Sequence, residues 1–245
     1  MFKIALDAGH GKYTAGKRCL KSLDKNETRE WFLNDRICDK VEKKLAMYSG
    51  YSLLRVDDTT GESDVSLENR VKKANNFGAD FYLSVHHNAG VYGGRGGGII
   101  SIAHTNSSAT SKKYQIIIYD ELILKTGLKG NRAIPTPLQK LYVCGATTMP
   151  AVLVECGFMD SSTDVPIILT EEFAEKAADA LTASLVKIGN LKPKTKELTT
   201  PNDIVWELSQ RIEITNTKKA VEDLTKAMNE NSSCYWMLRK IANKR

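Results

Sequence analysis

Three runs of apolar and partly β-branched residues along the chain each lead to a histidine or a glutamate. They are FKIALDAGH at residues 2–10, DFYLSVHH at residues 80–87 and PAVLVECGF at residues 150–158. Near-continuous apolar strands of this kind are typical of a sheet that helices cover on both faces. Ligands of such sheets bind beyond the carboxyl ends of the strands, so we expect the three strand ends to converge on one site.

Helical periodicity separates these strands. Apolar positions three and four residues apart follow Glu30 and predict one helix, and a second helix is predicted from Glu171 to Val186. The apolar positions of the first helix are Leu33, Ile37, Val41 and Leu45. Strands that alternate with helices predict an α/β fold, built as a single twisted, mostly parallel sheet with helices on both faces.

The C-terminal part of the chain has a different pattern. Residues 189–200, GNLKPKTKELTT, are polar and contain glycine and proline, which is typical of a linker. Beyond them, Pro201 suits the first position of a helix, and Asp203 follows a threonine at the spacing of a capping box. We therefore expect a main domain over residues 1–188, a linker, and a small all-helical module over residues 201–245.

The chain contains four histidines, and two of them are adjacent. If the strand stays extended, His86 points with Ser84 to one face of the sheet and His87 points to the other. We expect one metal ligand from this pair, with His10 at the end of the first strand as the second nitrogen ligand. The alternative for the pair is a polar loop without a metal. His104 is expected at the surface, because polar residues follow it.

Two glutamates compete to supply a carboxylate ligand. Glu27 has the spacing of a helix capping pair with Asp24, which would give Glu27 a structural role. Glu30 shares a helix face with Leu33 and Asn34, so it is expected to point inward, where an unpaired carboxylate is costly. A bound cation would explain Glu30, and we therefore favour it over Glu27.

Glu155 ends an apolar strand and stands two residues before Gly157. Its carboxylate is expected to be partly desolvated, so it needs either a chemical role or a charged partner. An ion pair with a buried arginine, Arg70 or Arg132, is an equally good explanation at this point.

Composition narrows the class of protein. The chain has 245 residues, 42% of them apolar, which is enough for one α/β core and a small appendage. Five scattered cysteines without a CxxC pair argue against a disulfide framework and a cysteine zinc site. The N-terminal apolar run is too short for a signal peptide, and no stretch approaches the roughly 18 apolar residues of a membrane span. We expect a protein that is made in the cytoplasm and inserts into no membrane.

The net charge of +6 favours anionic partners, which makes a basic nucleic-acid-binding protein the alternative from another functional class. Residues 193–245 carry ten Lys and Arg against seven Asp and Glu, a balance of only +3. This is a small charge for phosphate contacts, so we expect no nucleic-acid partner.

Several motifs, in their order along the chain, resemble the zinc-dependent N-acetylmuramoyl-L-alanine amidases of the type found in bacterial cell wall hydrolases and phage endolysins. The resemblance spans nearly all of residues 1–190. The motifs are LDAGHG at residues 6–11, Glu30 with Leu33 and Asn34, Arg55 and Asp58, the L..R...AN pattern from Leu67 to Asn75, SVHHNA from Ser84, Arg132, and PAVLVECGF with Asp164 downstream. The chain departs from the family pattern at Ala133, where glycine is usual, and in the unusually basic segment 11–25.

The resemblance implies roles for individual residues. The zinc ligands of the family correspond to His10, Glu30 and His86, and the catalytic glutamate of the family corresponds to Glu155. His87 fills a position that another residue usually holds. On this basis the cofactor is Zn²⁺.

The resemblance also implies an activity, the hydrolysis of the amide bond between the lactyl group of N-acetylmuramic acid and the L-alanine of the stem peptide. Asn88 and Arg132 become candidates for contacts with substrate or for support of the ligands. A carboxypeptidase or deacetylase that acts on the wall with the same metal chemistry is the alternative. The expected substrate is peptidoglycan of a Gram-positive-type wall, with anionic wall polymers as further partners, reached after release from the cytoplasm. The module at 201–245 would then serve wall targeting or self-association.

Overall fold

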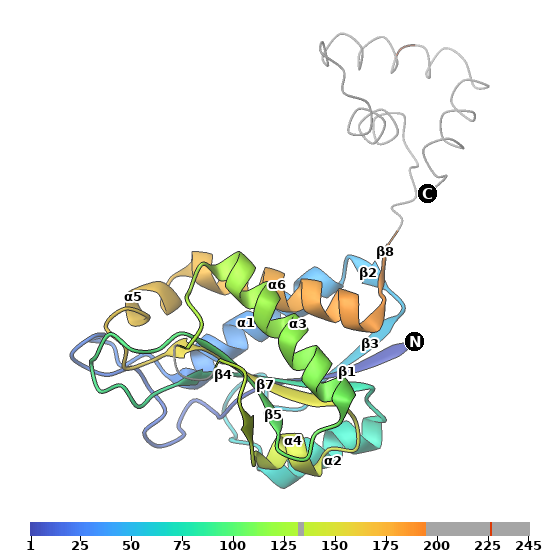
Figure 1. The fold of residues 1–245 in the computed structure, drawn as a ribbon, viewed down its shortest axis with the longest axis horizontal. Coiled ribbons are helices and arrows are strands. Elements are labelled where there is room, and N and C mark those ends of the chain that lie inside the picture. Colours follow the sequence, from blue (N-terminus) through green and yellow to red (C-terminus); the bar gives the residue numbers. More distant parts are fainter. Residues whose placement is uncertain (132–134, 195–225, 227–245) are drawn as a thin grey trace. The chain divides into compact units, whose positions relative to one another are not determined.

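The computed structural model describes residues 1–131, 135–194 and 226 of the chain (Figure 1). The strands are β1 (Phe2–Ala8), β2 (Tyr48–Ser49), β3 (Tyr51–Arg55), β4 (Phe81–Asn88), β5 (Ile99–His104), β6 (Leu138–Gln139), β7 (Ala151–Phe158) and β8 (Lys192–Pro193). The helices are α1 (Glu30–Leu45), α2 (Leu67–Phe77), α3 (Ala109–Thr126), α4 (Tyr142–Ala146), α5 (Val165–Ile168) and α6 (Glu171–Gly189). The elements predicted from the apolar runs and from the helical periodicity are all present.

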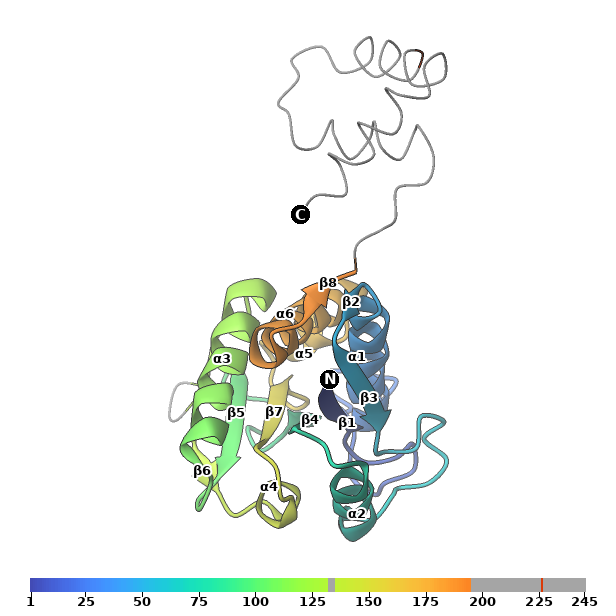
Figure 2. The same cartoon turned by 90° about the vertical axis from the view of Figure 1, so that its right-hand side faces the viewer.

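Six strands form the main sheet in the order β3-β1-β4-β7-β5-β6. Neighbouring strands are parallel from β3 to β7, β5 runs antiparallel to β7, and β6 is parallel to β5. Helices α1, α3 and α6 lie over one face of the sheet, and α2 and α4 lie over the other (Figure 2). The predicted α/β fold, with a mostly parallel sheet covered on both faces, is confirmed.

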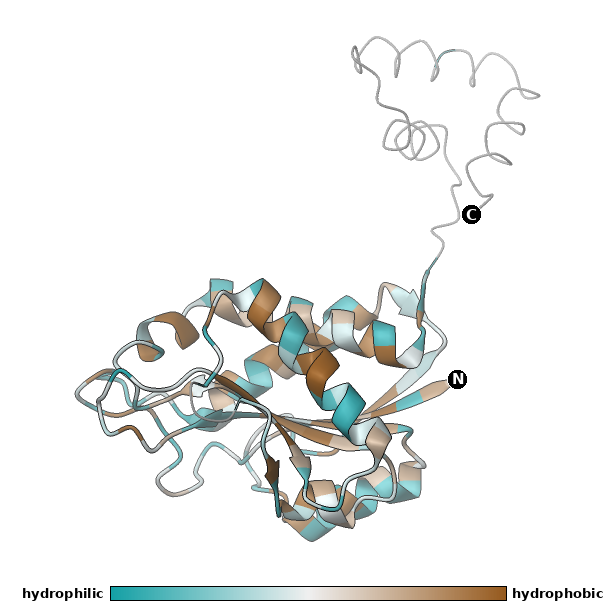
Figure 3. Cartoon of the chain, in the orientation of Figure 1, coloured by the Kyte–Doolittle hydropathy of each residue, from teal (hydrophilic) through white to brown (hydrophobic). Residues whose placement is uncertain are grey.

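The two faces of the sheet belong to two buried cores. Along β4, Leu83 and Val85 join the core shared with α1, α3 and α6, whereas Tyr82 joins the core on the side of α2 and α4. Figure 3 shows the matching pattern, with apolar colour along the central strands and mixed colour on the helices. Within the described ranges, no helix is long and apolar enough to cross a membrane.

The three apolar strands of the sequence are neighbours in the sheet. β4 lies between β1 and β7 and is parallel to both, so the carboxyl ends of all three strands meet at one edge. His86 pairs in register with Glu155, and Val85 pairs with Ala8 two residues before His10. The predicted convergence of the three strand ends is therefore confirmed.

The segment between β1 and α1 forms a folded loop that positions Glu30 at the carboxyl-terminal edge of the sheet. Asp24 accepts two backbone hydrogen bonds inside its own turn, and the helix begins only at Glu30. The expected capping pair of Asp24 and Glu27 is therefore wrong. Glu27 has a positive φ of 49° and lies outside the helix, and its carboxylate pairs with Arg18 at 3.2 Å. A structural role for Glu27 remains, but it is an ion pair.

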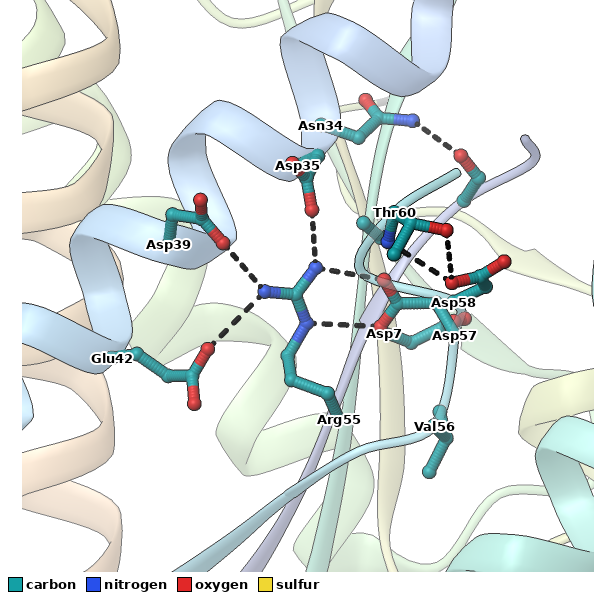
Figure 4. A network of polar contacts seen from close by, with 12 residues as sticks. Asp7, Asn34, Asp35, Asp39, Glu42, Arg55, Val56, Asp57, Asp58 and Thr60 are labelled. Carbon is teal, nitrogen blue, oxygen red and sulfur yellow. Dashed lines mark hydrogen bonds and ion pairs between the residues drawn. The ribbon is translucent and has the colours of Figure 1, made fainter. Parts of the chain in front are cut away.

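Arg55, at the end of β3, connects this strand to α1 through a partly buried network of charges (Figure 4). The side chain is surrounded by the carboxylates of Asp35, Asp39, Glu42 and Asp57. Its Nη2 donates to Asp35 at 2.6 Å, and Nε and Nη2 donate to the two oxygens of Asp57 at 2.9 and 2.7 Å. One guanidinium thus faces four carboxylates, so part of the negative charge is uncompensated.

The uncompensated charge predicts a stability that depends on pH through Asp35. Burial raises the pKa of Asp35 to about 6, and Asp39 and Asp57 add to this while Arg55 opposes it. A carboxyl whose pKa is higher in the folded state stabilises the fold below its unfolded pKa and loses that contribution as pH rises through 6. Asp35→Asn removes this loss, so its stability relative to the wild type should rise by about 2 kcal/mol between pH 4.5 and 7.5.

Urea unfolding of both proteins at the two pH values measures this difference. Asp39→Asn is the matched control, because it removes a half-exposed carboxylate from the same arginine. Between pH 4.5 and 7.5, the stability of Asp39→Asn relative to the wild type should rise by less than half as much as that of Asp35→Asn. A relative stability of Asp35→Asn that stays constant or falls with rising pH would contradict the assignment.

The folded unit ends later than the sequence suggests. Residues 1–193 form one compact unit, because Leu191 is buried and β8 pairs with β2 in a small antiparallel sheet. The first residues of the expected linker therefore belong to the main unit. The expected helical module at 201–245 lies outside the described residues apart from residue 226.

Candidate functional site

His10 stands just beyond the end of β1 in a strained backbone conformation. Its φ is +69°, a region that residues other than glycine rarely adopt. Arg70 of α2 stabilises this turn, because its Nη2 donates to the carbonyl of His10 at 2.9 Å and its Nη1 donates to the carbonyl of Ala8 at 2.8 Å. Strain held in place by surrounding contacts is typical of functional sites.

Arg70 is itself held by a buried carboxylate. Asp7 of β1 pairs with Arg70 and also accepts hydrogen bonds from Tyr82 at 2.8 Å and Ser84 at 2.7 Å. Burial alone would raise the pKa of Asp7, but Arg70 and these hydroxyl donors together lower it. The carboxylate is therefore ionised and its partners are fixed. The alternative in which Arg70 pairs with Glu155 is wrong, because Arg70 is committed to Asp7.

Glu30, the first residue of α1, presents its carboxylate to both histidines. The side chain is 1% exposed, and its Oε1 lies 3.3 Å from His10 Nε2 and 3.0 Å from His86 Nδ1. The backbone N–H of His87 also donates to Oε1, at 3.3 Å. Burial opposes the charge, but the two histidines overcome it and lower the pKa of Glu30. Position at the start of a helix adds to the stabilisation of the anion.

The ring of His86 packs against the backbone of Gly9. A Cβ on Gly9 would lie 2.0 Å from Cε1 and 2.3 Å from Nε2 of His86, so any other residue would displace the ring. This close approach gives Gly9 of the LDAGHG motif a specific role. Burial opposes a charged His86, but the Glu30 carboxylate outweighs it and raises the pKa of His86.

The three side chains fit a divalent metal ion. Ligand atoms from His10, Glu30 and His86 all lie within 4.8 Å of one another. Two imidazoles and one carboxylate from separate elements are a ligand set that leaves a further coordination position open. Glu30 Oε2 is buried and, among the described residues, has no hydrogen-bond partner, so the carboxylate keeps an oxygen that a cation would satisfy.

Glu155 lies on β7 directly beside His86. Its Oε2 is also buried and without a hydrogen-bond partner among the described residues. Burial raises the pKa of Glu155 to about 8, with His86 and Lys17 opposing and Glu30 adding to the rise. A carboxyl with an unsatisfied oxygen and a perturbed pKa next to a ligand cluster has the properties of a proton acceptor.

His87 points to the opposite face of β4, as strand parity predicts. Its ring is buried, its Nδ1 lies 2.8 Å from Asn34 Oδ1, and it packs against Phe173 of α6. Burial lowers the pKa of His87 to about 3, so the ring is neutral. Asn34 donates in turn to the carbonyl of Gly9 at 3.1 Å, which links His87 to the turn that carries His10.

The remaining candidate residues have different outcomes. Asn88 ends β4, and its Oδ1 accepts from the N–H of Ala89 at 2.8 Å. Arg132 lies outside the described residues, so its role stays a prediction. His104 is partly exposed, and its Nδ1 accepts a hydrogen bond from the Asn106 N–H at 3.1 Å.

Cavities open on both sides of the ligand cluster. One of about 450 Å³ lies on the side of α2 and α4 and is walled by apolar side chains that include Leu67, Leu141 and Val143. The other, of about 310 Å³, contains Glu155, Asn88 and Lys17. His86 lines both cavities, so the two cavities meet at the ligand cluster.

Comparison with known proteins identifies the family to which this fold and these motifs correspond. The family described as N-acetylmuramoyl-L-alanine amidase matches residues 4–187. The sporulation-specific N-acetylmuramoyl-L-alanine amidase of Bacillus subtilis is 33% identical over 192 residues, which cover 78% of this chain and 70% of that protein. The endolysin of Bacillus phage SPP1 is 32% identical over 199 residues, covering 78% of this chain and 68% of that protein.

Solved structures show the same fold. The catalytic domain of CwlV, an N-acetylmuramoyl-L-alanine amidase from Bacillus (Paenibacillus) polymyxa var. colistinus, superposes with a TM-score of 0.68 at 23% identity. The match covers 78% of this chain and all of that domain. An N-acetylmuramoyl-L-alanine amidase from Clostridium difficile 630 gives a TM-score of 0.68 at 24% identity, over 76% of this chain and 95% of that one.

Proposed function

Because the chain belongs to the N-acetylmuramoyl-L-alanine amidase family, we propose that His10, Glu30 and His86 hold a zinc ion and that Glu155 is the general base. The enzyme hydrolyses the amide bond between the lactyl group of N-acetylmuramic acid and the L-alanine of the stem peptide. The observation that carries the assignment of roles is the cluster itself, in which three ligand atoms meet beside an oxygen of Glu155 that no described residue hydrogen-bonds.

The ligand set favours zinc over other cations. Two imidazole nitrogens and one carboxylate, with an open position, are the common composition of catalytic zinc sites. Calcium and magnesium prefer sets of oxygen ligands, which this cluster lacks. When bound, Zn²⁺ makes a coordinated water more acidic and offsets the charge that develops on the carbonyl oxygen of the substrate.

Glu155 performs the proton transfers in this proposal. Its Oε2, which has no hydrogen-bond partner within the described part of the chain, accepts a proton from the attacking water, and the resulting carboxylic acid donates that proton to the departing amine of alanine. Ionised Glu155 is the active form at the start of the reaction. Beside a bound cation the pKa of Glu155 would lie below the value of about 8 that burial produces, which would favour the ionised carboxylate near neutral pH.

We infer that the substrate is peptidoglycan of a Gram-positive-type wall. The supporting observation is that the similar proteins include an amidase of Bacillus subtilis and an endolysin of a Bacillus phage. A wall-peptide carboxypeptidase or deacetylase would use the same metal chemistry, but the family match over residues 4–187 favours the amidase.

The end groups that appear on digestion test this function. Purified Gram-positive wall treated with the zinc-loaded chain should release new alanine amino groups without new reducing sugars. A chelator-treated sample is the control and should release neither. New reducing ends would indicate a glycosidase, and new amines on a residue other than alanine would indicate a peptidase, so either result would overturn the proposal.

A further inference from the structure

The loop between β1 and α1 fixes Lys17 next to the ligand cluster. The N–H of Glu30 donates to the carbonyl of Lys17 at 3.0 Å, which joins the backbones of the two residues. Arg18, the residue after Lys17, forms a β-bridge with Arg29, the residue before Glu30, so the backbone is also paired beside this contact. The position of Lys17 is therefore set by the same helix start that places Glu30.

The side chain of Lys17 points into the cavity that contains Glu155. It is 45% exposed, and its Nζ lies 3.8 Å from Glu30 Oε2, which is an ion-pair distance without a hydrogen bond. The cavity of about 310 Å³ is lined by Lys17 together with His86, Asn88 and Glu155. Among the described residues of its lining, Lys17 is the only lysine or arginine.

Lys17 differs in its partner from Lys12, Arg18 and Lys21 of the same loop. Lys12 pairs with Glu62 at 2.7 Å, whereas Arg18 and Lys21 both pair with Glu27, at 3.2 and 3.7 Å. Those acidic partners lie outside the ligand cluster. The partner of Lys17 is Glu30, whose charge a bound metal ion would offset, so the ammonium group of Lys17 is then available to another anion.

The substrate carries an anion close to the bond that is cleaved. The sugar and the lactyl group beside the amide are uncharged, and alanine contributes no charged side chain. The second residue of the stem peptide, a glutamate linked through its γ-carboxyl, carries a free α-carboxylate in some walls and a neutral carboxamide in others. That group is one residue, or about 3.5 Å of extended chain, beyond the alanine, within reach of a flexible lysine.

We propose that Lys17 binds this α-carboxylate and makes the enzyme selective for stem peptides that carry it. This inference rests on the proposed function, because it assumes that the stem peptide enters the Glu155 side of the site. Lys17 then forms a charge-assisted hydrogen bond with the α-carboxylate of the acidic substrate. In the amidated substrate the same ammonium group faces an uncharged carboxamide, so this stronger bond is lost. The segment that appeared unusually basic in the sequence thus contains one residue with a specific role.

Two soluble muramyl peptides that differ only in this group provide the test. Their second residue is D-glutamate in one and D-isoglutamine in the other. The zinc-loaded full-length chain should show a kcat/KM about tenfold higher for the acid, mainly through a lower KM. Lys17→Gln should bring this ratio close to one, and Lys17→Arg should preserve most of it. Zinc content, measured in parallel, should stay near one per chain in both variants.

Lys21→Gln is the matched control. Lys21 belongs to the same loop but is 77% exposed and lies outside the cavity, so its replacement should leave the ratio unchanged. Equal rates on both substrates in the wild type, or a ratio that Lys17→Gln leaves unchanged, would overturn the inference about Lys17 but not the proposed function. Loss of the ratio in Lys21→Gln as well would also overturn it, because the effect would then follow the charge of the whole loop. Cleavage of neither substrate would overturn the proposed function and this inference with it.

Discussion

Replacing Glu155 with glutamine should lower turnover by about a hundredfold or more while leaving zinc content near one per chain. Glutamine keeps the shape of the side chain but cannot accept and return a proton near neutral pH. Glu155 lies on β7 beside His86, and it does not belong to the group of three ligand atoms. Removing its charge should therefore affect the chemical step and leave the metal ligands in place.

Kinetics on a soluble muramyl peptide, combined with metal analysis of the same sample, measure both quantities. The loss should appear in kcat, because general-base catalysis acts in the transition state and contributes little to substrate binding. Binding of intact wall by Glu155→Gln should match the wild type, which provides a control for folding. A variant that keeps more than about a tenth of wild-type turnover, or that loses zinc, would show that Glu155 is not the general base.

The wild-type pH profile gives a second view of the same group. The proposed role of Glu155 requires its ionised form, so activity should fall as pH decreases through the pKa of this carboxyl. In the metal-free chain, burial places that pKa at about 8, and a nearby cation lowers it. An acid limb with a midpoint clearly below 8 is therefore expected for the zinc-loaded enzyme.

The strands that carry the site could be predicted from the sequence, because their signal is local. Each apolar run has the length and composition of a buried parallel strand, and the parallel arrangement brings the carboxyl ends together. Strand parity is also sufficient to separate His86 from His87, because His86 lines the cavity on the side of α2 and α4 whereas His87 packs against Phe173 of α6. The choice of Glu30 over Glu27 rested on helical periodicity, which the structure confirms by burying Glu30 and leaving Glu27 before the helix.

The supporting contacts could not be predicted, because they depend on the path of the chain in space. The sequence offered Arg70 as a partner for Glu155, but Arg70 pairs with Asp7 of β1, and β4 lies between β1 and the strand that carries Glu155. The need for glycine at position 9 arises only once the ring of His86 is placed. The contact between Lys17 and Glu30 likewise depends on the turn at Asp24, where the sequence pattern predicted a helix cap instead.

Glu30→Gln is expected to abolish stable metal binding, whereas the corresponding change at Glu27 should have little effect. Glutamine keeps an oxygen near His10 and His86 but carries no negative charge. Because the two imidazoles are neutral when they bind a metal ion, the carboxylate of Glu30 is the only negatively charged group among the three proposed ligands. Because one of the three proposed ligands loses its charge, zinc affinity should fall by more than about a hundredfold, and activity should disappear with the metal. Titration against a chelator of known affinity measures the change directly. Glu27→Gln is the matched control, because it makes the same substitution three residues earlier, at a side chain paired with Arg18 and remote from the cluster.

A separate readout distinguishes the loss of a ligand from the loss of the fold. In the metal-free chain the Glu30 carboxylate outweighs burial and raises the pKa of His86. Glu30→Gln removes this anion, so the pKa of His86, followed by NMR of its ring protons, should fall. A folded protein with a lower His86 pKa and no zinc identifies Glu30 as a ligand in contact with His86. If Glu30→Gln retained zinc while Glu155→Gln lost it, the roles assigned to the two carboxylates would have to be exchanged, because only one of them can supply the third bond to the metal.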